Sequence, residues 1–384
     1  MKKISITLIC LVLGILGGCS SVSLEGTNIS KDASIKKVVT SNANNKKDKE
    51  IFKNIEYDSQ SFCLKLIDWS TNKIIKKVNF KDNELVFKTF KVDNGYAVIS
   101  FTAEESIEKY TTPEGHKNIR VPKEFIRKTF KIYDYDLNLL KEIDLEEMFP
   151  QEMLSDVLLT LDISSDGNEV VLASDEKLYI YNIKLNQLKK IFENSNPKSI
   201  YFTQVKFTKD GERIVYTGVD PKDREENKET SISYGIIELK DGSINNFREK
   251  DYKDARKINI SGTYVCITDS ADGWTKTSSG KVLILNLLEK KGFSINVDGL
   301  ESTFADVSED GKYIITANEN MDEGILIRQY QISSGKIIKE EKYTPENNNF
   351  ILEYISKGEE PYKYYFFISR DGHKECFEFV CEEE

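Results

Sequence analysis

Histidine is almost absent from this chain of 384 residues, which contains only His116 and His373. A lone histidine makes no zinc site, and His373 follows an Asp-Gly pair, where we expect a solvated turn residue. The chain has no Gly-x-Ser-x-Gly elbow for a serine nucleophile, no Gly-rich phosphate loop and no Cys-x-x-Cys pair. The common catalytic and cofactor motifs are therefore missing, and we expect neither an enzyme nor a cofactor.

Calcium ligands in the usual spacing are also missing. Two acidic stretches, Asn318–Gly324 and Asp269–Gly273, place several side-chain oxygens close together. Neither has the EF-hand spacing, and neither has the bidentate glutamate at its expected place. We interpret both stretches as polar turns and predict no metal site.

Excess positive charge is missing from most of the chain. Eight of the 54 basic residues and three of the 64 acidic residues precede Glu50, so residues 50–384 carry 46 and 61, a net charge of −15. An acidic body repels phosphate backbones, so we expect no nucleic-acid partner. The abundance of Lys, Asn, Ile and Glu indicates an AT-rich genome and, with the N-terminal segment described next, a Gram-positive cell.

No apolar run reaches the roughly 20 residues that a membrane-spanning helix needs. The longest one, Ile4–Leu16, follows Lys2 and Lys3 and precedes small residues, the order found in a secretory signal peptide. The stretch ends Leu16-Gly17-Gly18-Cys19, which resembles a bacterial lipobox. The resemblance implies that residues 1–18 are removed and that the Cys19 thiol carries a diacylglyceryl group. An ordinary signal peptide with an incidental cysteine is the alternative.

Residues 19–49 are expected to form a flexible tether, since they are rich in Ser, Asn, Lys and Thr and contain no aromatic residue. Two acyl chains give stable membrane anchoring, and a coil of this length spans roughly 30 Å. We therefore predict an extracytoplasmic protein that is attached to the cell membrane by lipid, with a single domain over residues 50–384.

A short phrase recurs through this domain: alternating apolar residues, Ser or Thr, one residue, Asp-Gly, and a second apolar run. Strong copies begin at Leu161, Val205, Ala305 and Phe366, and weaker ones at Phe90 and Ile258. Alternation with period two predicts strands, and Asp-Gly supplies the positive φ angles of a tight two-residue turn. Each phrase is thus a predicted β-hairpin.

A second hairpin follows most copies, as in the segments that begin at Leu178, Ile236 and Ile327. Two hairpins make a four-stranded unit of roughly 45 residues, the size of a propeller blade. Such units must pack around an axis to bury both faces of each sheet. We predict five blades over 83–146, 157–192, 202–248, 256–297 and 303–342. The chain ends, 51–80 and 350–381, form one shared blade or two, for six or seven in total.

The repeated Ser-x-Asp-Gly turns resemble the propeller repeats of TolB-type and WD40-like bacterial proteins. They depart from true WD40 units, because no Gly-His pair opens a blade and Trp69 alone lies near a Trp-Asp position. The resemblance implies an all-β propeller and no particular activity. A regular β-sandwich is the alternative fold.

Four cysteines lie in the domain: Cys63, Cys266, Cys376 and Cys381. Cys266 is expected to be a buried small hydrophobe. Cys376 and Cys381 are five residues apart, so on one strand they face opposite sides. Because propellers often close by joining their chain ends, a Cys63–Cys376 or Cys63–Cys381 disulfide is left open.

The longest insertions indicate where a partner binds. In a four-stranded blade A–B–C–D, we place the Asp-Gly turn between strands A and B, at the same end as the C–D turn. The large insertions, Ala103–Glu124, Val219–Ser231, Ser270–Gly280 and Asn318–Gly324, then fall between strands B and C, at the opposite end. Long loops on a rigid scaffold commonly bind, and exposed aromatic residues contribute much contact energy. The candidate binding residues are Tyr110, His116 and Trp274; tolerated insertions without a partner are the alternative.

These observations predict a membrane-anchored, non-catalytic binding or scaffold protein for a macromolecule of the cell envelope, either a protein or a polysaccharide. An enzyme that acts on extracellular glycans through carboxylates near the propeller axis is the alternative. A purely structural subunit of an envelope complex is a third hypothesis. Three or more converging carboxylates would favour the enzyme.

Overall fold

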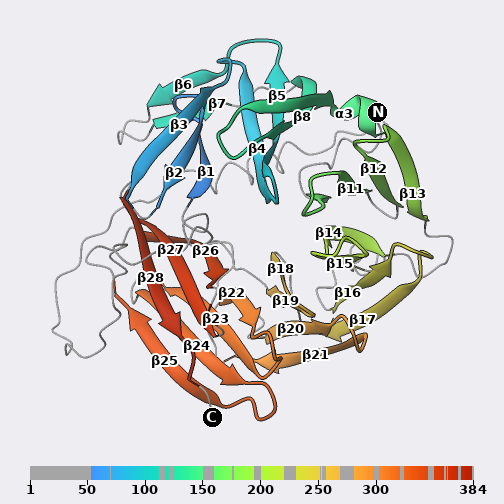
Figure 1. Ribbon diagram of the computed structural model, residues 1–384, viewed down its shortest axis with the longest axis vertical. Helices are drawn as coiled ribbons and strands as arrows, with labels where there is room; N and C mark the ends of the chain where they lie inside the picture. Colours follow the sequence, from blue (N-terminus) through green and yellow to red (C-terminus); the bar gives the residue numbers. More distant parts are fainter. Residues whose placement is uncertain are drawn as a thin grey trace.

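The computed structural model of the protein shows seven antiparallel sheets arranged around one axis (Figure 1). The structure describes residues 53–382 with these gaps: 70, 112–116, 121–124, 150–159, 175–176, 194–199, 220–230, 251, 253–256, 269–280, 298–301, 321–323, 345–349, 359, 361 and 371–372.

Five of the seven blades have four strands, each paired with the next in chain order. Blade 2 contains β4 (Glu84–Val92), β5 (Gly95–Ala103), β8 (Phe125–Tyr133) and β9 (Leu139–Asp144). Blade 3 contains β10 (Leu161–Ile163), β11 (Glu169–Ser174), β12 (Lys177–Asn182) and β13 (Gln187–Glu193). Blade 4 contains β14 (Tyr201–Phe207), β15 (Arg213–Val219), β16 (Ser231–Glu238) and β17 (Ile244–Lys250). Blade 5 contains β18 (Lys257–Ser261), β19 (Tyr264–Thr268), β20 (Lys281–Asn286) and β21 (Lys291–Asn296). Blade 6 contains β22 (Ser302–Val307), β23 (Tyr313–Asn320), β24 (Gly324–Gln331) and β25 (Ile337–Tyr343).

The chain ends form two separate three-stranded blades. Blade 1 contains β1 (Lys53–Asp58), β2 (Cys63–Asp68) and β3 (Lys73–Asn79), and blade 7 contains β26 (Phe350–Lys357), β27 (Lys363–Arg370) and β28 (His373–Val380). The chain passes from the end of β3 directly into β4, so β1–β3 take positions B, C and D. In the same way, β26 follows strand D of blade 6 and takes position A. The propeller therefore has seven blades, and the β-sandwich alternative is wrong.

The remaining elements lie at the connections. β6 (Glu108–Thr111) and β7 (Lys117–Arg120) pair as a hairpin between β5 and β8. A single turn of helix, α3 (Leu145–Met148), follows β9 and buries Leu145 and Met148.

Three Asp-Gly turns connect strands A and B as predicted, and their geometry shows a side-chain cap. In blade 3, Ser164 donates its Oγ hydrogen to Asp166 Oδ1, and the same Oδ1 accepts the backbone N–H of Asn168 at 3.0 Å. Gly167 has φ of 71°, whereas Asp166 is not among the residues with positive φ. The prediction that both turn residues have positive φ was therefore wrong: glycine supplies that conformation and aspartate caps the turn.

The copy that begins at Phe366 lies at a different place in its blade. Its Asp-Gly pair, residues 371–372, falls outside the described residues, but the strands on either side are β27 and β28, which occupy positions B and C. The pattern predicted an A–B turn there and was wrong. The reason is that A–B and B–C hairpins share the same alternation, so the sequence phrase does not distinguish them.

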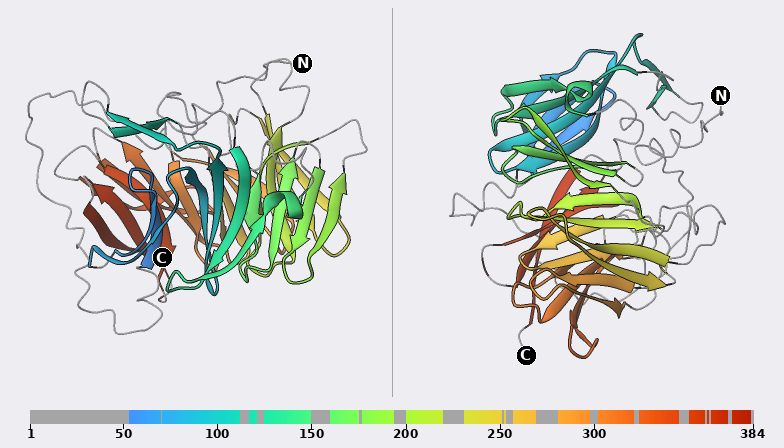
Figure 2. Two further views of the ribbon diagram at one scale, coloured as in Figure 1. Left: turned by 90° about the horizontal axis from the view of Figure 1, so that it is seen from above. Right: turned by 90° about the vertical axis from the view of Figure 1, so that its right-hand side faces the viewer.

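Backbone hydrogen bonds place the A–B and C–D turns at one end of the propeller, which we call the plain end. The C–D turn donates to the A–B turn of its own blade in blades 3, 4, 5 and 6, through Ile183→Asn168, Leu239→Glu212, Leu287→Thr263 and Ile332→Lys312. The B–C and D–A connections lie at the other end, the looped end. In the side view, the β6–β7 hairpin stands at the side opposite the C-terminus (Figure 2, left).

The hydrophobic core consists of clusters between neighbouring blades. The largest cluster joins blades 2 and 3. The cluster between the last blade and the first consists of Ile67, Trp69, Tyr365, Phe367 and Cys376. Alternate residues of the central strands pack against opposite neighbours because successive side chains point to opposite faces of a sheet. The ring is thus closed by side-chain packing between the first and last blades.

Candidate functional site

Tyr110 lies on the β6–β7 hairpin at the looped end, as the position of its insertion predicted. It faces Asn118 across the hairpin, and its side chain is 48% exposed. The base of the hairpin is fixed to the blade: Ile107 donates its N–H to the Asp82 carbonyl at 2.9 Å and is buried with Phe62 and Leu85. The chain therefore presents an exposed aromatic ring from a rigid base.

The other candidate binding residues lie outside the described part of the chain. His116 belongs to the segment 112–116 and Trp274 to the segment 269–280. The strands that border the second of these are β19 and β20, so Trp274 lies in a B–C connection of blade 5, as predicted. Val219–Ser231 likewise falls between strands B and C of blade 4.

The described residues of the fourth insertion belong to strands. Asn318 and Asn320 belong to β23 and Gly324 to β24, where they continue the pairing of these strands. The side chain of Asn318 is 2% exposed. The stretch was predicted as a polar turn, but the pairing of β23 with β24 continues to Asn320 and Gly324.

The polar residue within each A strand is a structural element that sequence reasoning missed. Lys88 donates to the Leu161 carbonyl of the next blade at 2.7 Å, and Lys206 donates to the Ile258 carbonyl at 3.0 Å. Asp162 accepts the N–H of Phe207 at 2.8 Å. In blade 5, Asn259 donates its amide to the Ala305 carbonyl at 3.1 Å. These bonds link the innermost strands of successive blades.

The ring of contacts ends at blade 7. Lys357 donates to the Val307 carbonyl at 2.6 Å and lies 3.5 Å from Asp306 Oδ2. Burial raises the pKa of Asp306 to about 6 and also raises the pKa of Asp162. For Asp162, Lys206, Asn259 and Asp306, the signal was present in the sequence as a charged or amide residue between two apolar ones.

Among the described residues, the innermost strands carry four carboxylates, one on each of four blades. Glu84, Asp162, Asp306 and Glu353 belong to the A strands of blades 2, 3, 6 and 7. Glu84 is bonded to Ser100 and Lys131 within blade 2, whereas Asp162 and Asp306 are each bound to a neighbouring blade. No group of three or more His, Cys, Asp or Glu side chains suited to a metal occurs among the described residues. Asp162 and Asp306 therefore serve the packing of blades.

A cavity of about 190 Å³ lies at the plain end between blades 6 and 7. Its charged lining is occupied by contacts between the blades: Tyr362 donates its hydroxyl to Asp310 at 2.7 Å, and Lys357 binds blade 6 as described above. Lys363, which also lines the cavity, lies 2.9 Å from Glu378 within blade 7. The cavity therefore does not present a cluster of charges suited to one ligand class.

The cysteines are free, buried thiols in the structure, so the disulfide that the sequence left open is not formed. Cys376 packs toward blade 1, whereas Cys381 packs toward blade 6, in agreement with their predicted opposite faces. Cys63 donates to the Leu64 carbonyl. Burial raises the pKa of Cys381 to about 12, so this thiol stays protonated at neutral pH.

No described helix has the length and apolar character needed to cross a membrane. Cys19 and the rest of the N-terminal segment lie outside the described residues. The lipid anchor therefore stays a prediction from the sequence.

Comparison with known proteins identifies the fold and no family. No protein-family model matches the chain, and no curated protein matches it. Among solved structures, 1177 chains match, and such a widespread fold does not select one function. One of them comes from a structure titled "Crystal Structure of Mitotic Checkpoint Complex", with a TM-score of 0.50 and 8% sequence identity. The match covers 95% of this chain and 100% of that chain, and it supports the WD40-like propeller fold alone.

Proposed function

We propose that the protein is a lipid-anchored, extracytoplasmic propeller that binds a macromolecule of the cell envelope through its looped end and performs no catalysis. The observation that carries this proposal is the exposed Tyr110 on the β6–β7 hairpin, whose base is bonded to blade 2. A rigid scaffold that exposes an aromatic side chain on a projecting hairpin is suited to an interface, because little conformational entropy is lost on binding.

The difference between the two ends of the propeller supports this choice of face. The plain end consists of short turns that are closed by their own side chains and bonded to one another. The insertions that begin at residues 103, 219 and 270 each connect a strand B to a strand C, and those strands adjoin the looped end. Trp274 belongs to the last of them and would add a second aromatic ring.

The glycan-hydrolysing alternative receives no support from the innermost strands. A glycosidase needs two carboxyl groups that face one substrate, at a separation of roughly 5–10 Å. Three of the four carboxylates on the described innermost strands, Glu84, Asp162 and Asp306, are instead bonded to other residues of the propeller. We therefore assign Asp162 and Asp306 to blade packing and propose binding as the function.

A photo-crosslinking amino acid at single positions in intact cells tests the proposed face. Introduced in place of Tyr110, it should give adducts with an envelope protein or polysaccharide. The matched control replaces Leu185, which is 65% exposed at the plain end. Adducts to a macromolecule from position 185 with none from position 110 would contradict the proposal.

A further inference from the structure

Exposed apolar side chains are concentrated on the outer circumference of the plain end. Of the twelve large hydrophobic residues exposed in the described chain, ten lie in C–D turns, in the first half of D strands or at the end of β28. We call these ten the apolar rim: Ile74, Ile75, Leu139, Leu140, Leu185, Leu188, Leu288, Phe293, Ile337 and Val380. Singly exposed apolar residues are ordinary, but these recur at the C–D turn or in strand D of five blades and at the end of strand C in blade 7, which indicates a shared surface.

The turns that carry the rim hold their leucines in fixed outward positions. In blade 5, Asn286 Oδ1 accepts the backbone N–H groups of Leu288 and Glu289, both at 3.0 Å, and Lys290 closes the turn with φ of 53°. In blade 3, Asn182 Oδ1 accepts the N–H of Leu185 at 2.9 Å, and Asn186 has the same φ.

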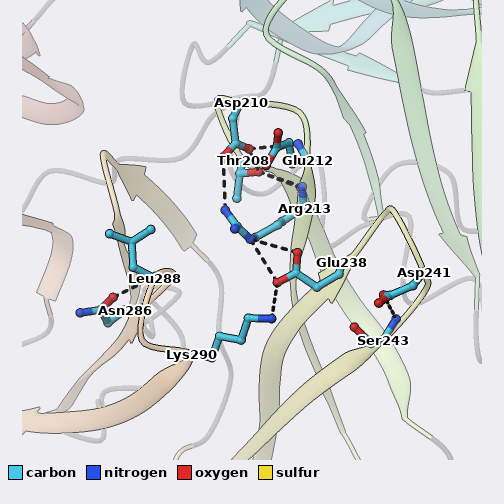
Figure 3. Close-up of polar contacts among 10 residues, drawn as sticks. All are labelled: Thr208, Asp210, Glu212, Arg213, Glu238, Asp241, Ser243, Asn286, Leu288 and Lys290. Carbon is cyan, nitrogen blue, oxygen red and sulfur yellow. Dashed lines mark hydrogen bonds and ion pairs between the residues drawn. The ribbon is translucent and has the colours of Figure 1, made fainter.

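Both leucines are highly exposed: Leu288 is 68% exposed and Leu185 is 65% exposed. Figure 3 shows the Leu288 side chain outside the polar network that joins Arg213, Glu238 and Lys290. Two turns with side-chain hydrogen bonds thus hold a leucine in a solvent-exposed position.

Lysines accompany the apolar rim. The six C–D segments, 69–77, 134–141, 183–190, 239–245, 287–293 and 332–339, contain twelve lysines and four acidic residues. Residues 50–384 as a whole have an excess of acidic residues. The six C–D segments therefore have a net charge of the opposite sign to that of the whole domain. Exposed lysines beside leucine, isoleucine and phenylalanine are the side chains that interfacial segments place at the surface of an anionic bilayer.

Carboxylates at the plain end lie mainly in the A–B turns, which are nearer the axis than the rim. Asp166, Asp210 and Asp310 each accept a hydroxyl and a backbone N–H of their own turn. These bonds lower the pKa of all three. Arg213 and Lys312 lie within 3.3 Å and 3.0 Å of Asp210 and Asp310 and offset part of their charge.

The chain enters the propeller at this same end. β1 begins at Lys53, which pairs with Asp68, and Asp68 directly precedes the C–D turn of blade 1. The 33 residues from 20 to 52 connect Lys53 to Cys19, and a coil of that length has a mean span of roughly 30 Å. A lipid on Cys19 would hold the plain end, rather than the looped end, next to the membrane.

We infer that the plain end is a docking surface for an anionic lipid membrane, with the apolar rim at the headgroup level and its lysines on the lipid phosphates. The orientation that follows directs the looped end, with Tyr110, away from the membrane toward envelope partners. The orienting effect of the tether rests on the proposed lipid anchor, whereas the lipid affinity of the rim does not.

Lysine footprinting of the full chain tests this inference. The protein is mixed with vesicles of phosphatidylcholine containing phosphatidylglycerol, or of phosphatidylcholine alone, and treated briefly with an amine-acetylating reagent. Acetylation of Lys73, Lys184 and Lys291 should fall about fivefold with the anionic vesicles and much less with the neutral ones. Acetylation of Lys81 and Lys109, at the looped end, should not change.

A pair of matched variants controls for general adsorption. Leu185→Glu with Leu188→Glu should restore acetylation of Lys184 and Lys189 in the presence of anionic vesicles. Tyr110→Glu with Ile126→Glu, which alters the two exposed apolar residues outside the rim, should leave the shielding of the rim unchanged. Because all four side chains are exposed, the circular dichroism spectra of both variants should match that of the wild type.

Three results would overturn the inference: equal shielding of the two ends, no shielding of rim lysines by anionic vesicles, or shielding that grows with protein concentration without vesicles. The last result would identify the rim as a contact between copies of the chain. The same footprint on Cys19→Ala protein separates the two proposals, because rim shielding that persists there supports lipid docking even if the anchor is absent.

Discussion

The indole of Trp69 stands edge-on to the ring of Phe367, with 5.6 Å between the ring centroids and 88° between the ring planes. The two residues belong to the first and last blades, so this contact closes the ring of seven sheets. Among the described residues, the cluster around them contains five buried side chains, fewer than the main cluster at any other junction between blades. Closure therefore depends on few side chains.

Trp69→Ala should lower the free energy of unfolding by about 3–5 kcal/mol, the usual cost of removing a buried tryptophan side chain. Urea unfolding followed by tyrosine fluorescence measures the loss. Ile74→Ala, an exposed position in the same blade, is the control and should change the free energy by less than about 0.5 kcal/mol. Equal effects of the two substitutions would show that the first and last blades do not hold the ring closed.

Two equivalent turn glycines should differ in their tolerance of alanine. Gly211 and Gly311 lie in equivalent A–B turns of blades 4 and 6, with φ of 70° and 71°. Alanine at either position therefore costs about 1–2 kcal/mol of backbone strain. A Cβ at Gly211 meets no atom within 4 Å, whereas one at Gly311 lies 2.1 Å from the Tyr264 hydroxyl of the neighbouring blade.

Gly311→Ala should therefore be more destabilising than Gly211→Ala by about 1–3 kcal/mol, the usual cost of forcing an extra group into a packed site. The difference between their denaturation midpoints measures this. Gly311→Ala with Tyr264→Phe, which removes the nearest oxygen, should recover part of the loss. No difference between the two single variants would show that the A–B turn of blade 6 does not pack on blade 5 as described.

The fold was largely predictable from the sequence because one physical pattern recurs. Alternating apolar residues with Asp-Gly turns predicted the five central blades, and each was confirmed within a few residues of its expected bounds. The position of the Asp371-Gly372 turn was not predictable, because hairpins of either kind have the same alternation. The number of blades was left between six and seven, because it depends on whether the two chain ends pair as strands of one sheet or form two sheets that pack together. That is a long-range contact, and no local sequence pattern reveals it.

The candidate site was predictable only in part. The insertion pattern correctly placed Tyr110 at the looped end, since connection length follows from strand order. The bonds of Lys88, Asp162 and Asp306 between blades were missed, because a charged residue in a strand of alternating pattern usually lies on the solvated face. The apolar rim was missed for a similar reason: each of its residues belongs to an otherwise ordinary amphipathic strand or turn.

The buried carboxyl group of Asp306 should make stability depend on pH. Its pKa in the folded protein is about 6, above its ordinary value of 3.8, so the folded state binds the proton more tightly than the unfolded state. Stability should therefore fall as pH rises from about 4 to 6, by about 3 kcal/mol for this group alone.

Asp306→Asn should remove this component of the pH dependence, as measured by urea unfolding at pH 4, 5, 6 and 7. Asp241→Asn is the control, because hydrogen bonds from Ser243 lower the pKa of Asp241. The stability that Asp241 contributes is therefore lost only as the pH falls below its ordinary pKa of 3.8. An unchanged difference between pH 4 and 7 in Asp306→Asn would mean that Asp306 is not desolvated in the folded protein.

Cys19→Ala should release the protein from membranes, because it removes the thiol that would carry the two acyl chains. The measurement is the share of protein in the membrane fraction, together with incorporation of a labelled fatty acid. Cys266→Ala, which changes a buried thiol in the propeller, is the control and should leave both unchanged. Membrane association of Cys19→Ala without lipid labelling would contradict the anchor.

The central claim is that the looped end binds an envelope macromolecule, and quantitative capture from cross-linked cell envelopes tests it most directly. Tyr110→Ala with Trp274→Ala should reduce the captured material about a hundredfold, since loss of two aromatic anchors typically costs at least 2–3 kcal/mol. Leu185→Ala with Leu188→Ala, at the plain end, should capture as much as the wild type. Undiminished capture by the Tyr110 and Trp274 double variant, with a normal circular dichroism spectrum, would contradict the account.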